Sequence, residues 1–167
     1  MLKRIIPILL VLCFVISGCT NSNSTASQNQ NITNIKFIIP KGPLDEWSID
    51  EKPIKDCTPS IVVNELLKYP HIYPEGTKLL SLEVKEKIAY VNMSHEFNSY
   101  SLGSTGIEHI IFTITDTLCL NKSLGIDGVK FLLDGEEVPI IGEFETDKVI
   151  VPDITLTDDN QIKLIVN

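Results

Sequence analysis

A stripe of branched aliphatic side chains between residues 106 and 120 constrains the fold of this chain most. Its members recur at intervals of three and four, the period of one face of an α-helix: Ile107, Ile110, Ile111, Ile114 and Leu118. Branching at Cβ lowers the intrinsic stability of a helix. We therefore expect packing against other elements, rather than helix propensity, to hold residues 106–120 in place.

The ends and the polar face of this helix can also be predicted. Thr105, followed three residues later by Glu108, forms a capping box that starts a helix at residue 106. We expect Glu108, Thr115 and Asp116 to lie outside the core, because charged and polar side chains usually stay in water.

Alternating apolar and polar residues predict strands over residues 35–39, 80–84, 88–92 and 129–133. In the second of these, Leu80, Leu82 and Val84 should face the core. The third is apolar on both faces, so it should lie inside the sheet.

A shorter helix should begin at Thr58 and Pro59, a capping side chain before a proline. Its buried stripe ends before Pro70 and comprises Ile61, Val62, Leu66 and Tyr69. Residues 44–56 fit either a polar strand or an ordered loop. The order β-α-β-β-α-β predicts an α+β single domain, with both helices packed on one face of a small mixed sheet.

The N-terminus has the pattern of an export signal. Lys3 and Arg4 precede an apolar run over residues 5–16, which ends in Ile16-Ser17-Gly18-Cys19. This pattern resembles a bacterial lipoprotein signal, which implies removal of residues 1–18 and a diacylglyceryl group, with palmitate-type chains, on the sulfur of Cys19. A transmembrane helix or an ordinary secretion signal is the alternative, but the run is shorter than the roughly 20 residues that a span requires.

Between this signal and the first strand, residues 20–34 are Ser, Thr, Asn and Gln with one Ala and one Ile, and carry no charge. So little apolar surface cannot offset the entropy cost of ordering the backbone. We therefore expect residues 19–34 to be a lipidated N-terminus and a disordered tether.

The charge of the chain excludes some partners. Removing residues 1–18 takes away Lys3 and Arg4 and no acid, so the net charge of −8 becomes −10. Nucleic acids and anionic lipid surfaces require clusters of Lys and Arg. We expect no nucleic-acid partner, and membrane attachment through the lipid alone.

Two cysteines, Cys57 and Cys119, remain once Cys13 leaves with the signal and Cys19 is modified. An exported compartment permits a disulfide between them. Two free thiols are the favoured alternative, and the spacing of the two residues is not that of metal ligands.

Five segments in register resemble the GerMN domain of sporulation and spore-germination lipoproteins. They are Pro74-Glu75-Gly76-Thr77-Lys78-Leu79-Leu80-Ser81-Leu82, Ala89-Tyr90-Val91-Asn92-Met93-Ser94-His95-Glu96-Phe97, Gly103-Ser104-Thr105, Thr117-Leu118 and Val129-Lys130-Phe131-Leu132-Leu133-Asp134-Gly135. The resemblance covers residues 35–145. It implies a fold like the ring-building domains of the sporulation channel apparatus and a non-enzymatic role through protein contacts outside the membrane.

Residues 146–167 form a C-terminal extension beyond this resemblance. Two strands over residues 149–151 and 162–166, with a turn at residues 157–160, predict a β-hairpin. Such a hairpin either extends the sheet or, as we prefer, covers its edge.

The sequence offers little for catalysis or for a metal. His71, His95 and His109 have no ligand spacing. The neighbouring acids Glu136 and Glu137 point to opposite faces of a strand. We expect no cofactor, no metal site and no catalytic residue.

These observations favour a lipid-anchored interaction module on the extracytoplasmic face of the cell membrane, acting in sporulation or germination. Its partners would be other envelope or sporulation proteins, and self-association stays open. The alternatives are a cell-envelope hydrolase that uses a carboxylate pair such as Glu136 and Glu137, and a small-ligand-binding lipoprotein. About 150 residues rarely supply the two lobes that surround a ligand cleft in the latter class.

Overall fold

The computed structural model describes residues 31–42, 46–98 and 103–165. Its helices are α1 (Pro59–Leu66) and α2 (Gly103–Leu120), with short 3-10 helices η1 (His95–Asn98) and η2 (Lys122–Leu124). Its longer strands are β1 (Ile32–Pro40), β2 (Trp47–Lys55), β3 (Leu79–Lys85), β4 (Ile88–Met93) and β5 (Gly128–Leu133). Its short strands are β6 (Glu136–Glu137), β7 (Ile140–Ile141), β8 (Phe144–Glu145), β9 (Ile154–Leu156) and β10 (Ile162–Leu164).

The main sheet has the order β3-β4-β5-β6, in which β4 and β5 are parallel and the other neighbours antiparallel. The prediction that residues 88–92 lie inside the sheet is confirmed, since β4 has a neighbour on each side. α2 makes the crossover between the two parallel strands, which is the usual way to connect such a pair.

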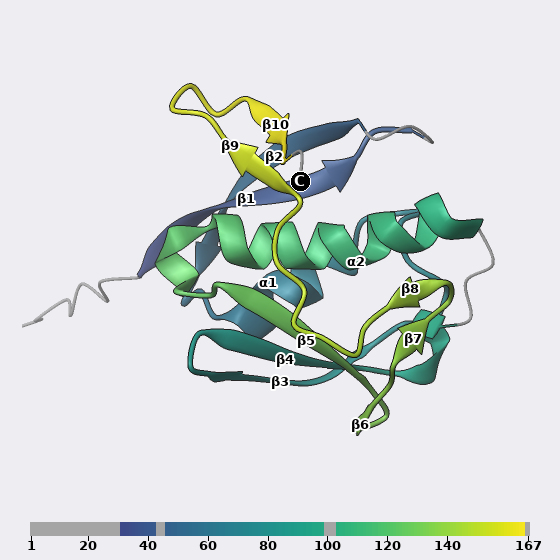
Figure 1. The fold of residues 1–167 in the computed structure, drawn as a ribbon. Coiled ribbons are helices and arrows are strands. Elements are labelled where there is room, and N and C mark those ends of the chain that lie inside the picture. The colour runs from purple at the N-terminus through teal and green to yellow at the C-terminus, as the bar shows by residue number, and fades with distance from the viewer. Residues whose placement is uncertain (1–30, 43–45, 99–102, 166–167) are drawn as a thin grey trace, which may run out of the picture.

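The predicted single sheet is wrong in one respect, because β1 does not join it. β1 instead pairs with β2 as a separate antiparallel hairpin. The segment that fitted either a strand or a loop is therefore a strand. α2 lies between this hairpin and the main sheet, while α1 packs beside α2 and β3 (Figure 1). The architecture is α+β, with α2 as a central layer rather than as one of two helices on one face.

β1 also begins earlier than predicted. Ile32, Thr33 and Asn34, which the polar composition assigned to the tether, pair with Lys55, Ile54 and Pro53 of β2. The cross-strand ladder supplies the hydrogen bonds that stabilise this polar stretch.

Both helices start near the predicted positions, with one difference. At α1 the side chain of Thr58 accepts a hydrogen bond from the N–H of Ile61, so the predicted cap is confirmed. α2 begins at Gly103, so Thr105 lies within its first turn and cannot be the N-cap that the capping box requires.

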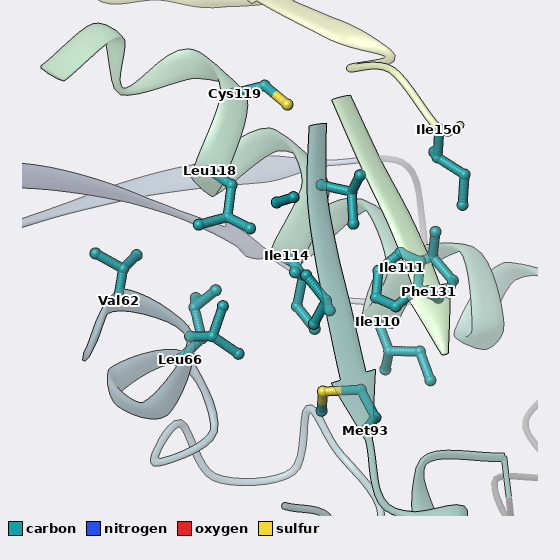
Figure 2. Packing of buried hydrophobic residues seen from close by; sticks show 14 of the residues in the cluster. Val62, Leu66, Met93, Ile110, Ile111, Ile114, Leu118, Cys119, Phe131 and Ile150 are labelled. Carbon is teal, nitrogen blue, oxygen red and sulfur yellow. The ribbon is translucent and has the colours of Figure 1, made fainter. Parts of the chain in front are cut away.

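The core lies where α2, α1, β1, β4 and β5 meet (Figure 2). Phe37, Phe97 and Phe131 are among its largest fully buried side chains, and the rings of the last two stack with centroids 5.7 Å apart. All five residues of the predicted stripe of α2 are buried.

The burial of α2 extends beyond this stripe, because residues 113–119 are buried without interruption. The prediction that Thr115 and Asp116 lie outside the core is therefore wrong, whereas Glu108 is exposed as expected. The hairpin β1–β2 and the C-terminal segment cover the face that the sequence pattern assigned to solvent.

The side chains of Thr117 in α2 and of Asn121, which directly follows α2, satisfy the edge of β1 that β2 leaves open. Asn121 accepts from the N–H of Lys36 at 2.9 Å and donates to the carbonyl of the same residue at 2.8 Å. Thr117 accepts from the N–H of Ile38 at 2.9 Å. Asn121 also donates to the carbonyl of Thr117 at 2.7 Å, which satisfies one of the last carbonyls of α2. These bonds fix the position of the hairpin on the helix.

The β3–β4 hairpin turns on Glu86 and Lys87, both with positive φ (50° and 65°) as a two-residue type I′ turn requires. In β3 an irregularity in the register between Leu79 and Ser81 displaces Leu80 from the predicted alternation. Leu80 is 48% exposed and Val84 is 42% exposed, so the prediction that they face the core is wrong. Leu82 packs on the core as expected.

The C-terminal segment returns along the outer edge of β5. Ile150 and Val129 exchange two backbone hydrogen bonds of 2.8 Å, so Ile150 covers this edge next to β6. The buried ammonium of Lys130 donates to the carbonyls of Thr146, at 3.2 Å, and Asp147. β9 and β10 then form an antiparallel hairpin, with the first strand at residues 154–156 rather than at the predicted 149–151.

We predict that Asn121→Ala destabilises the protein by about 2–4 kcal/mol, because buried backbone groups of Lys36 and Thr117 lose their partners. Urea denaturation should show this as a lower midpoint with an unchanged slope. Asn64→Ala is the matched control, since the exposed Asn64 donates to the carbonyl of Ser60 within α1 and holds no other element in place. An equal loss in both variants would contradict the role assigned to Asn121.

Candidate functional site

Cys19, the predicted lipid attachment site, lies outside the described residues, and so do residues 1–18. Attachment through Cys19 therefore stays a prediction. Within the described part of the chain, neither helix has the length and apolar character needed to cross a membrane.

The two acids considered for hydrolysis are exposed to solvent. Glu136 and Glu137 form the exposed two-residue strand β6, after a tight turn at Asp134 and Gly135. The carboxylate of Glu137 lies 3.4 Å from the ammonium of Lys130. Glu137 thus offsets the charge of a buried cation, which is a structural role.

The three histidines lie in separate places. His71 is exposed in a turn with φ of 63°. His95 lies near the carboxylates of Asp134 (3.6 Å) and Glu96 (3.5 Å). His109 packs edge-on against Trp47 of β2, with ring centroids 5.3 Å apart. Over residues 31–42, 46–98 and 103–165, no three His, Cys, Asp or Glu side chains are grouped so that they could hold a metal ion.

Cys57 and Cys119 are both free thiols in the structure. Cys57 is half-buried, and burial raises its pKa. Cys119 is buried in α2, and burial, with the nearby charges of Asp116 and Asp127, raises its pKa to about 12. Neither group is poised to act as a thiolate nucleophile.

The free edge of the main sheet is the first candidate surface for protein contacts. β3 ends the strand order, and no described strand pairs with its outer side. Because residues next to a two-residue turn form a hydrogen-bonded pair, Lys85 points its backbone groups toward Ile88. By alternation, the N–H and C=O groups of Leu82 and Val84 point outward.

Side chains around this edge combine apolar and charged character. Val84 is 42% exposed. The ammonium of the exposed Lys85 lies 2.6 Å from the carboxylate of the exposed Glu83. The ammonium of Lys85 also lies 5.5 Å from the ring centroid of Tyr90 on β4. An edge with outward backbone groups can accept an added strand, and such charged side chains restrict which strands fit.

A buried carboxyl pair is the second candidate, and the sequence pattern did not predict it. Asp116 on α2 is fully buried, and both of its oxygens lack a donor of ordinary geometry. The carboxyl and the backbone N–H of Asp153, from the segment before β9, lie against it. Burial raises the pKa of Asp116 to about 9, and the neighbouring charge of Asp153 adds to this effect. Asp116 is therefore protonated at neutral pH.

The helix face that carries Asp116 gave one overlooked signal. His109, Thr113 and Asp116 lie at i, i+4 and i+7, so they form a polar row beside the apolar stripe. Nε2 of His109 and Oγ1 of Thr113 are also buried without a hydrogen-bond partner in the structure. The row marks a second face of α2, but its spacing alone does not show that this face is covered, because a polar row beside an apolar stripe usually faces water.

Comparison with known proteins identifies the fold and the family. The family Germane, described as sporulation and spore germination, matches residues 25–139. None of the curated proteins matches this chain.

Two solved structures with TM-scores above 0.5 show the same fold. The first GerMN domain of the sporulation protein GerM from Bacillus subtilis is 17% identical, over 73% of this chain and 96% of that one, with a TM-score of 0.54. The tandem GerMN domains of the same protein are 20% identical, over 70% of this chain and 44% of that one, with a TM-score of 0.52. A third structure, "Putative Lipoprotein from Clostridium perfringens", is 25% identical over 73% of this chain and 87% of that one, with a TM-score of 0.45.

The family match spans more than half of the sequence and includes both helices and the main sheet up to β6. The chain therefore belongs to the Germane family of sporulation and spore germination.

Proposed function

We propose that this chain is a lipid-anchored module on the extracytoplasmic face of the cell membrane, which binds other proteins during sporulation or spore germination and catalyses no reaction. Membership of the Germane family carries the proposal, because it supplies the process. The lipoprotein signal that ends at Cys19 supplies the location.

The free edge of β3 is the surface that we propose for these contacts. Its outward backbone groups at Leu82 and Val84 offer main-chain hydrogen bonds to an extended segment of a partner. The charges of Glu83 and Lys85 give the edge selectivity, since an added strand must place compatible side chains opposite them.

The partners that we propose are other proteins of the cell envelope or of the sporulation machinery, with a second copy of this chain as the alternative. The net charge of −10 after signal removal disfavours nucleic acid, because so few cations cannot neutralise a phosphate backbone.

The anchor can be tested by substitution in the full chain. We expect Cys19→Ala to move the protein from the membrane fraction to the soluble fraction of a cell lysate, because two acyl chains are needed for stable attachment. Cys13→Ala is the matched control, since it changes a cysteine of the same apolar segment that takes no lipid. Continued co-sedimentation of Cys19→Ala with membrane vesicles would refute lipid anchoring.

The β3 edge can be tested with a photo-crosslinking amino acid at position 84. We expect crosslinks to specific envelope proteins of sporulating cells from Val84, and none from Val151, which is 60% exposed in the C-terminal segment. Val84→Pro should abolish capture of the same proteins, because proline removes an outward N–H without breaking the ladder to β4. Capture by Val84→Pro at the wild-type level would show that partners bind elsewhere.

A hydrolase assay tests the absence of catalysis. The full chain should release no product from peptidoglycan fragments. Hydrolysis that disappears in Glu136→Gln or Glu137→Gln would instead support the carboxylate-pair enzyme.

A further inference from the structure

We propose that Asp116 and Asp153 form a proton-dependent latch that docks the C-terminal segment, residues 150–165, onto α2, and that this docking weakens as pH rises through the neutral range. The inference is independent of the proposed function, because it concerns contacts within one chain.

The geometry places the pair at the centre of the docked segment. Asp153 lies between Ile150, which bridges to Val129 of β5, and Ile154, which is fully buried. The segment passes over α2 on its way to β9 (Figure 1). Both carboxyl oxygens of Asp116 and Oδ1 of Asp153 are buried there, and the carboxyl of Asp153 interacts with that of Asp116. Undocking the segment would therefore expose Asp116 to water.

A proton decides whether the pair attracts or repels. Two ionised carboxylates in contact and out of water repel each other, and each loses hydration. One shared proton converts the same contact into a hydrogen bond between a carboxyl donor and a carboxylate acceptor. The docked state therefore holds a proton that the undocked state releases.

Other charges near α2 are engaged elsewhere or act weakly. Lys36 of β1 donates to Asn160 at 2.5 Å, and Lys130 of β5 binds the carbonyls of Thr146 and Asp147. Glu65 of α1 pairs with Lys68. Glu145 of β8 is exposed. None of these groups contributes to the raised pKa of Asp116. Cys119, one turn along α2, stays a neutral thiol because of its raised pKa.

Linkage gives the direction of the pH effect. The pKa of Asp116 is about 9 when docked and near its ordinary value of 3.8 when exposed. Docking is thus strongest below pH 4, and its equilibrium constant falls about tenfold per pH unit between pH 4 and 9. Above pH 9 both states are deprotonated at this residue, and the dependence ends.

Hydrogen exchange of the full chain between pH 6 and 9 tests the latch, with rates corrected for the intrinsic pH dependence of exchange. The amide of Ile150, which donates to Val129, and that of Ile165, which donates to Asp153, report on docking. In the wild type we expect their opening constants to rise about tenfold per pH unit. Asp116→Asn should remove this slope, because an amide can donate to Asp153 without a titrating proton.

Two controls isolate the latch. Asp158→Asn removes an exposed acid of the β9–β10 turn, so its slope should equal that of the wild type. Any effect of His109, on the same face of α2, on the opening constants would remain in Asp116→Asn. The difference between the wild type and Asp116→Asn therefore reports on Asp116 alone. The proposal would be overturned if the opening constants of the wild type did not change with pH. It would also be overturned if those of Asp116→Asn rose with pH as steeply as in the wild type.

Carbon-13 NMR of the wild-type aspartate carboxyls provides a test that needs no folded variant. We expect the Asp116 carboxyl to stay protonated at pH 7 and to titrate several pH units above an exposed aspartate. Titration of Asp116 near pH 4 would refute the latch even if Asp116→Asn did not fold.

Discussion

The burial of α2 from several sides is the constraint on which the rest of the structure depends. A helix rich in β-branched residues gains little from its own backbone, so its stability comes from the surfaces that cover it. The β1–β2 hairpin covers one side, the main sheet another, and the C-terminal segment a third. Residues 113–119 are consequently buried throughout, and the short polar side chains among them make specific contacts with β1 and with the segment before β9.

Much of this fold could be predicted from periodicity, because local patterns report local structure. The stripe of α2, the cap at Thr58 and the interior position of β4 are confirmed. The wrong predictions concern features set by distant contacts. β1 lies outside the main sheet because Asn121 and Thr117, more than seventy residues away in sequence, satisfy its second edge. Leu80 is displaced by a register irregularity that alternation alone does not reveal.

The candidate sites differ in how visible they are in the sequence. The lipid attachment at Cys19 depends on a local motif, so it can be proposed without a structure. The buried pair of Asp116 and Asp153 cannot, because its members are thirty-seven positions apart and each alone resembles a surface acid. Its properties arise only when the C-terminal segment removes Asp116 from water and places Asp153 beside it. The β3 edge is intermediate, since a strand over residues 80–84 was predicted whereas its place at the end of the sheet was not.

The way in which the first strand is held has a mechanical consequence for a tethered protein. β1 begins at Ile32, so tension from an anchor at Cys19 would reach β1 through its first residue. Antiparallel ladder bonds run across the strand direction, and the bonds from Asn121 and Thr117 hold the opposite edge of the same strand. A pull along β1 would therefore load both rows of bonds together in shear, rather than opening them one at a time. Tension from such an anchor would thus pass through β1 into α2.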